Sequence, residues 1–297
     1  MDRPLVSTTF LDGTAEHAMS LDGQWDVCEV PAAREIADIA LERLQWRAAS
    51  VPGTVGGALR DAGGPEALAT ERDLDARAFL FRRRFSFAQG DRSSAMLVFD
   101  GLATIVDVWL NGALLLRARN MFRRHVTRTN DLLRAENELI LHFRPLQSEL
   151  DRKRPRGRWT VRMAKHRNLR FLRTSLLGRM HGWGGRHPVV GPWQGVRLLH
   201  NPRVVLEHLR IVPSLEGSDG SLLVSIAGRA SPGRFPSALK VRMEDREYTI
   251  PVAREEGRFH ADSLLRIPGV EAWWTHDLGA QRRYPVALSL QAGQDTV

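Results

Sequence analysis

The chain has 297 residues, a single cysteine and a formal net charge of +9. This length allows two ordinary domains, and one cysteine excludes an internal disulfide. The first residues lack the basic and apolar blocks of a secretory signal, and no apolar run approaches the roughly 20 residues of a membrane span. The sequence therefore predicts a cytoplasmic protein that makes no membrane contact.

Strands dominate the predicted elements of the first half. Leu21–Val27 is typical of a turn that enters a strand with Trp25 pointing inward, and a short helix is expected over 58–62. Phenylalanines at even spacing around Arg82 and Arg84 predict a strand with one buried face over 79–87. Further strands are expected at 96–99, 104–110, 138–143 and 196–199.

Asn111-Gly112 is the clearest turn signal in the chain. It separates the apolar runs Val108–Leu110 and Ala113–Leu116. Because both central residues of a type I′ turn have positive φ, which Asn and Gly tolerate, we expect a two-residue β-hairpin here.

Positive charge concentrates between Arg144 and Arg173, and almost all of it is arginine. Within this stretch, 158–177 has loosely helical apolar spacing and is interpreted as a surface helix. Nucleic-acid binding through the segment is disfavoured, because no docking motif or stacking aromatic group accompanies the charge.

The stretch from Gly178 to Pro192 holds too many glycines and prolines for a helix or a strand. It is expected to be a shaped loop, serving either as a buried plug or as a binding surface. After Asn201-Pro202, about six strands are expected in roughly ninety residues, which is typical of an immunoglobulin-like sandwich.

Motifs for common chemistries are missing from the sequence. His181 and His187 are six residues apart with no carboxylate between them, so no metal site is expected. No nucleophile elbow or phosphate loop occurs, and no cofactor is expected. Asp73 and Asp75 are interpreted as turn-stabilising residues, and Cys28 as a buried, inert thiol.

Several short motifs occur in an order that resembles the N-terminal region of family-2 glycoside hydrolases, closest to the β-mannosidase branch. They are Leu21–Trp25, Trp46–Val55, Arg72–Asp75, Phe79–Arg82, Leu97–Leu102, Asp107–Gly112, Glu136–Leu139 and Glu271–His276. The resemblance implies an all-β chain, with a jelly-roll (galactose-binding-like) sandwich over 1–200 and an immunoglobulin-like sandwich over 201–297. In that family a (β/α)8 barrel follows and carries both catalytic glutamates.

The resemblance therefore implies that this chain holds no catalytic residue and no barrel, that Asn137-Glu138 does not correspond to the catalytic pair, and that the chain is inactive alone. Trp183, Gly184, Arg186 and His187 become the candidate substrate-binding residues, as part of a loop that bounds the sugar pocket. Relatives of the branch carry an aspartate that touches a sugar hydroxyl, and here Gly184 stands in its place.

Three functions follow as hypotheses. The first is the non-catalytic portion of a β-mannosidase-like hydrolase, which would bind a β-mannoside only together with a barrel. Its barrel-facing surface would associate with a partner chain or with itself. The alternatives are a stand-alone carbohydrate-binding or scaffold protein and, more remotely, nucleic-acid binding through the arginine-rich segment.

Overall fold

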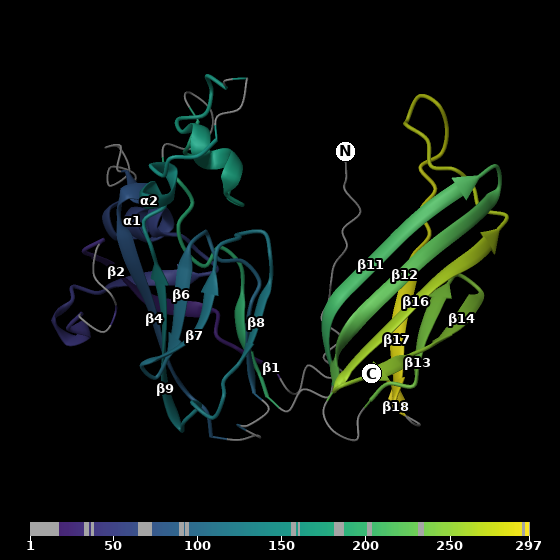
Figure 1. Cartoon of the computed structure of the whole chain (residues 1–297), viewed down its shortest axis with the longest axis horizontal. Coiled ribbons are helices and arrows are strands. Elements are labelled where there is room, and N and C mark those ends of the chain that lie inside the picture. Colours follow the sequence, from purple (N-terminus) through teal and green to yellow (C-terminus); the bar gives the residue numbers. More distant parts are fainter. Residues whose placement is uncertain are drawn as a thin grey trace. The chain divides into compact units, whose positions relative to one another are not determined.

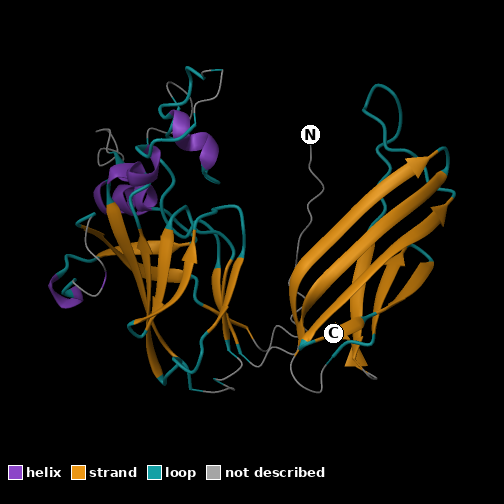
Figure 2. Cartoon of the chain, in the orientation of Figure 1, coloured by secondary structure: helices purple, strands orange, loops and turns teal. Residues whose placement is uncertain are grey.

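The computed structural model describes residues 18–32, 36, 39–64, 73–88, 92, 95–155, 159, 161–180, 187–200, 204–230, 235–292 and 295–296. These residues fall into two compact units, and the division between them lies between residues 201 and 202 of the chain (Figure 1). Each unit is built from antiparallel sheets, and the described helices all belong to the first unit (Figure 2). The expected all-β fold is confirmed, and the described residues contain no (β/α)8 barrel.

The first unit is a jelly-roll sandwich of a six-stranded sheet, β3-β2-β4-β9-β6-β7, and a four-stranded sheet, β1-β10-β5-β8. Its strands are β1 (Ala18–Ser20), β2 (Gly23–Val30), β3 (Arg47–Val51), β4 (Ala78–Ser86), β5 (Met96–Phe99), β6 (Val106–Leu110), β7 (Ala113–Ala118), β8 (His125–Arg128), β9 (Glu136–Phe143) and β10 (Val196–Leu199). Side chains from both sheets form one apolar core, in which Trp25 is buried as expected.

Strand β4 shows why its sequence pattern predicts only part of its environment. Phe79, Phe81 and Phe85 are buried and Arg84 is exposed, as the alternation predicts. Arg82 also belongs to the outward face but is buried, because its guanidinium lies 3.9 Å from the centroid of the Trp46 ring. It also donates to a carboxylate oxygen of Asp26 at 2.9 Å, which compensates the buried charge.

The hairpin between β6 and β7 has the expected two-residue turn. Asn111 and Gly112 have φ of 49° and 83°, and Leu110 pairs with Ala113. The Asn111 side chain also accepts a hydrogen bond from the backbone N–H of Glu138 at 2.8 Å and donates to Oδ1 of Asn137 at 2.9 Å. The turn is therefore tied to the start of β9.

The described part of the first unit also contains two short α-helices and three 3-10 turns: α1 (Val55–Gly63), α2 (Gln147–Leu150), η3 (Leu41–Arg43), η5 (Leu74–Ala76) and η6 (Arg167–Phe171). Thr54 caps α1 by accepting from the backbone N–H of Gly57 at 3.1 Å. The helix expected over 158–177 is wrong as a continuous element: its described part contains only η6, where Leu169 is buried and Phe171 exposed. The apolar residues of this segment do not form one helical stripe.

The second unit packs the sheet β11-β12-β16-β15 with the sheet β14-β13-β17-β18. Its strands are β11 (Val204–Glu216), β12 (Asp219–Ala230), β13 (Ala238–Met243), β14 (Arg246–Pro251), β15 (Ala253–Glu255), β16 (Arg258–Pro268), β17 (Val286–Ala292) and β18 (Asp295–Thr296). This is the expected immunoglobulin-like sandwich, with Val224, Val241 and Leu290 fully buried in its core.

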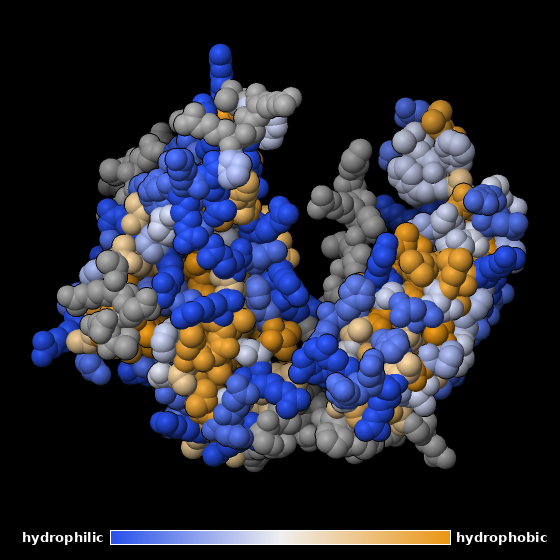
Figure 3. Space-filling model, in the orientation of Figure 1, coloured by the Kyte–Doolittle hydropathy of each residue, from blue (hydrophilic) through white to orange (hydrophobic). Residues whose placement is uncertain are grey.

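The surface shown in Figure 3 carries hydrophobic residues mainly over the strands of each unit. None of the described helices has the length and apolar character needed to cross a membrane.

Candidate functional site

The candidate site is the loop between Gly178 and Trp193. Trp183, Gly184 and Arg186, three of the four residues expected to bound a sugar pocket, lie outside the described residues. His187 is described and half-buried. The structure therefore defines how the two ends of the loop are held.

The two ends of the loop approach each other closely. Gly178 has φ of +74°, and a Cβ at this position would lie 2.2 Å from the carbonyl carbon and oxygen of His187. Only glycine permits both this backbone conformation and this approach. A Cβ on Gly56, in the first turn of α1, would lie 4.0 Å from that of His187, so this end of the loop packs on α1.

A buried ion pair holds the two ends of the loop against η5. The Arg179 guanidinium donates to both carboxylate oxygens of Asp75, from Nε and Nη2, each at 2.7 Å. It also donates to the carbonyl oxygen of Ser175 at 2.7 Å and to that of Val189 at 3.4 Å. One side chain therefore joins residues before and after the loop to η5, with both charges buried and paired.

The returning end of the loop joins the sandwich through backbone hydrogen bonds. The N–H of Val55 donates to the carbonyl of Val190 at 2.8 Å, and Gly191 exchanges two hydrogen bonds of 3.0 Å with Ala103. The indole N–H of Trp193 donates to the carbonyl of Met121 at 2.9 Å. This hydrogen bond ties Trp193, at the returning end of the loop, to the segment before β8.

Sequence reasoning missed the pairing of Asp75 with Arg179. Asp73 does stabilise its turn as expected, accepting from the backbone N–H of Asp75 at 3.2 Å. Asp75 was given the same role, but its carboxylate is instead committed to an arginine 104 residues away. No local pattern reveals such a contact, because each residue type is common in loops.

Each buried carboxylate among the described residues of this unit accepts a hydrogen bond from an arginine. Besides Asp75, these are Asp107, which accepts from Arg144 at 2.7 Å, and Glu149, which accepts from Arg154 at 2.9 Å. A glycosidase instead needs two carboxyl groups that flank a substrate. Each of these three interactions joins a carboxylate to an arginine, so none of them is a pair of carboxyl groups of that kind.

The Asn137-Glu138 pair has structural contacts. Asn137 is buried and joins the backbone of Arg134, accepting from its N–H and donating to its carbonyl, both at 2.7 Å. Glu138 forms an ion pair of 3.0 Å with exposed Arg84. Both residues therefore stabilise the start of β9.

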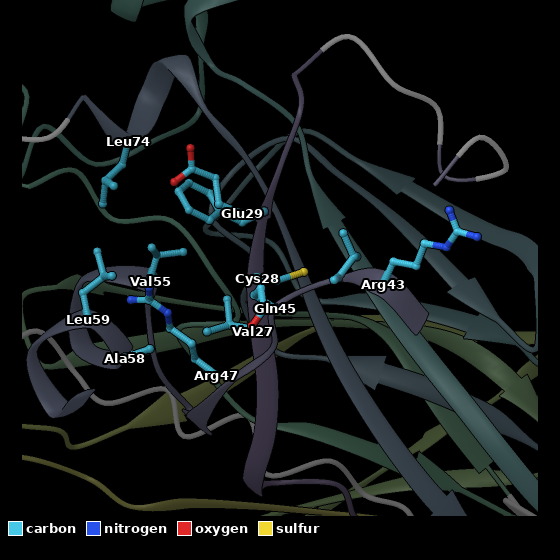
Figure 4. A pocket seen from close by; sticks show the side chains of 12 residues that line it. Val27, Cys28, Glu29, Arg43, Gln45, Arg47, Val55, Ala58, Leu59 and Leu74 are labelled. Atoms are coloured by element: carbon cyan, nitrogen blue, oxygen red, sulfur yellow. The ribbon is translucent and has the colours of Figure 1, made fainter. Parts of the chain in front are cut away.

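A cavity of about 370 Å³ lies beside β2. Figure 4 shows Val55, Ala58 and Leu59 of α1 together on one side of this strand and Arg43 on the other. Glu29 is the only acid among its lining residues, and it pairs with Arg77. Burial raises the pKa of the Cys28 thiol to about 12, so the thiol is neutral near pH 7 and is not a nucleophile there.

Metal chemistry has no support among the described residues, which contain no group of three His, Cys, Asp or Glu side chains able to hold an ion. The described part of the site is therefore the two ends of the loop, which hydrogen bonds and the Asp75–Arg179 ion pair hold in place.

Comparison with known proteins identifies a family and several relatives. The model of the family described as glycosyl hydrolase 2 galactose-binding domain-like matches residues 30–194. Among curated proteins, β-mannosidase B of Thermothelomyces thermophilus is 28% identical over 210 residues, covering 68% of this chain and 24% of that protein. The β-mannosidase of Rattus norvegicus is 22% identical over 231 residues, covering 72% and 26%. The chain thus spans about a quarter of the length of these relatives.

Solved structures share the fold of this chain. The β-D-mannosidase of Dictyoglomus thermophilum superposes with a TM-score of 0.71 at 22% identity, covering 92% of this chain and 34% of that one. The exo-chitosanase CsxA of Amycolatopsis orientalis gives a TM-score of 0.61 at 16% identity, covering 94% and 32%. At these identities the likeness concerns the fold alone.

Proposed function

Because the chain belongs to the glycosyl hydrolase 2 galactose-binding domain-like family, we propose that it works as the non-catalytic part of a β-mannosidase-like hydrolase. The resemblance to the N-terminal region of family-2 glycoside hydrolases, in the β-mannosidase branch, is confirmed. Members of this family act on carbohydrates. The proposal adds that β-mannosides are the substrate and that a (β/α)8 barrel supplies the acid/base and the nucleophile.

The observation that carries the proposal is the commitment of the buried carboxylates to arginines. Asp75, Asp107 and Glu149 each contact at least one guanidinium within 3 Å. A glycosidase instead needs two carboxyl groups that flank the substrate, and a carboxyl group occupied by an arginine does not have that arrangement. The described residues thus support a binding and positioning role.

In this proposal the jelly-roll domain comprises residues 1–200 and the immunoglobulin-like domain residues 201–297. Trp183, Gly184, Arg186 and His187 form one wall of the sugar pocket. The ion pair of Arg179 and the close approach at Gly178 support this proposal, because they fix both ends of the loop. A loop with fixed ends loses less conformational entropy when it binds a partner.

The second unit carries a surface suited to a partner domain. Trp273, Trp274 and Leu278 are 54%, 50% and 70% exposed. They lie in the loop between β16 and β17, which projects beyond the strands (Figure 1). The loop is ordered by its own contacts, including the hydrogen bond from the N–H of Trp274 to the carbonyl of Ala280 at 3.0 Å. An ordered apolar knob of this kind is typical of an interface.

We propose that the barrel binds to this knob, or that a second copy of the chain binds there where the barrel is absent. The single cysteine, which is buried and free, supports a cytoplasmic location.

The first test measures hydrolysis of 4-nitrophenyl β-mannoside by the purified chain. No release of nitrophenol above the blank is expected, because in this proposal the barrel supplies the acid/base and the nucleophile. Turnover that co-purifies with the chain through two further columns would overturn the proposal.

The second test measures self-association by light scattering after size exclusion. Replacing Trp273 and Trp274 by Ser is expected to reduce the mean mass at high protein concentration, because this removes the aromatic part of the knob. Leu264→Ser is the matched control, since Leu264 is 63% exposed on β16 of the same unit. Equal effects of both variants would exclude a specific role of the knob.

A further inference from the structure

The arginine-rich segment forms a second pocket of about 240 Å³, between the end of α2 and η6. Nine residues line it, of which five are basic and none is acidic: the basic ones are Arg152, Lys153, Arg154, Arg167 and Arg170. Such a lining produces a strong positive potential inside a concave site. An anion is the ligand that this potential favours.

Part of this positive charge is held in place by one buried carboxylate. Glu149 forms ion pairs with Arg119 at 2.8 Å, Arg152 at 3.1 Å and Arg154 at 2.9 Å. Its single negative charge cannot neutralise three guanidinium groups, so this cluster keeps a net positive charge. The side chain of Asn168 fixes the same loop by donating to the carbonyls of Leu150 and Arg152, each at 2.7 Å. The pocket wall is therefore pre-organised.

Two further cations are free to meet a ligand. Lys153 and Arg167 are exposed, and neither has an acidic partner among the described residues. Because their charges are unpaired, an incoming anion would not have to break an existing ion pair.

An aromatic ring stands beside these charges. Trp159 lines the pocket and is 59% exposed, with the Arg170 guanidinium 4.4 Å from its ring centroid. The stacking aromatic group that the sequence did not reveal is therefore present in the fold. A flat apolar surface next to basic groups suits a ligand that combines a ring face with an anionic substituent.

We infer that this pocket binds an anionic sugar, meaning a single pyranose ring that bears a carboxylate or a phosphate group. The basic side chains bind the anionic group, and Trp159 packs on the ring. The volume of about 240 Å³ lies below the roughly 300–1,000 Å³ typical of drug-sized ligands, so it suits one ring. Nucleic-acid binding would require a longer basic track with several stacking residues. This inference is independent of the proposed function, since the pocket lies wholly in the first unit and involves no barrel.

The test is titration calorimetry of the full chain with galacturonate, glucose 6-phosphate, inorganic phosphate, mannose and a single-stranded oligonucleotide. The first two ligands separate a carboxylate from a phosphate source. We expect at least one of them to bind more tightly than inorganic phosphate and mannose, and to bind more weakly as salt is raised.

Variants then locate the binding. Lys153→Glu with Arg167→Glu is expected to weaken binding of the acidic sugar roughly tenfold or more, because two charged donors are reversed. Trp159→Ala is expected to weaken binding of the acidic sugar without affecting inorganic phosphate. Arg128→Glu with Arg210→Glu is the matched control: both arginines are exposed and lie outside the pocket.

Four outcomes would overturn the inference: no binding of either acidic sugar, equal binding of inorganic phosphate or mannose, an unchanged affinity in the Lys153/Arg167 variant, and binding of the oligonucleotide alone.

Discussion

Replacing Arg179 by Met tests whether the buried ion pair holds the base of the loop. The substitution leaves the Asp75 carboxylate buried without its partner and removes the donors to the carbonyls of Ser175 and Val189. Breaking a buried pair by removing one member costs about 3–5 kcal/mol. We therefore expect the free energy of unfolding of the first unit to fall by about this amount.

The control is the double variant Asp75→Leu with Arg179→Met, which removes both charges. Its free energy of unfolding should fall by less than that of Arg179→Met, with a difference of ~1 kcal/mol or more, because no uncompensated charge remains. Urea denaturation of the full chain gives the free energy. Hydrogen–deuterium exchange then assigns it to a unit: amides of 18–201 should lose protection while those of 204–296 keep theirs. A loss below ~1 kcal/mol for Arg179→Met, or equal losses for both variants, would refute the reasoning.

The remaining predictions concern single positions. Gly178→Ala should destabilise the first unit by more than Gly217→Ala destabilises the second. Both glycines have positive φ, which costs a non-glycine residue about 1–2 kcal/mol. Only at Gly178 would the new Cβ also clash with backbone atoms, at 2.2 Å. Urea midpoints at equal denaturant slope compare the two, and equal shifts would contradict the packing argument. Burial raises the pKa of Cys28 from 9.0 to about 12. The folded thiol thus keeps its proton while the unfolded one ionises, and stability should decline between pH 9 and 12 by up to about 1.4 kcal/mol per pH unit. Cys28→Ala should remove that part of the slope, and an unchanged profile would show that the thiol is not its source. Asn111→Ala should lower the free energy of unfolding by about 1–3 kcal/mol, because it removes three side-chain hydrogen bonds and a residue that tolerates positive φ. Thermal melts measure this loss, with Leu114→Ala in the same hairpin as the control.

Local features of the fold could be predicted from the sequence. The turn at Asn111-Gly112 and the alternation through β4 depend on residues within a few positions of one another. The same holds for strands of the second unit such as β12 and β16, in which buried side chains alternate with more exposed ones. The order of the motifs, all but one of them in the first unit, also carried the family resemblance, because it reflects many short segments at once.

Features that depend on distant residues could not be predicted. Arg82 belongs by pattern to an outward face, yet Trp46 and Asp26 cover it. The position of Arg179 beneath the loop requires Asp75, which is remote in sequence and near only after folding. The pocket at Trp159 is similar, since its ring meets Arg170 through a loop whose path no periodicity describes.

The pairing of β1 with β10 has a consequence for how the first unit joins other sequences. Ala18 pairs with Leu199 in antiparallel register, so the unit's first and last strands are neighbours in one sheet. The chain therefore enters and leaves this unit at adjacent points, about 5 Å apart between paired Cα atoms. A module with adjoining ends can be transplanted into a loop of another protein without separating the flanking segments. This sandwich is accordingly a candidate for domain grafting as an independent cassette.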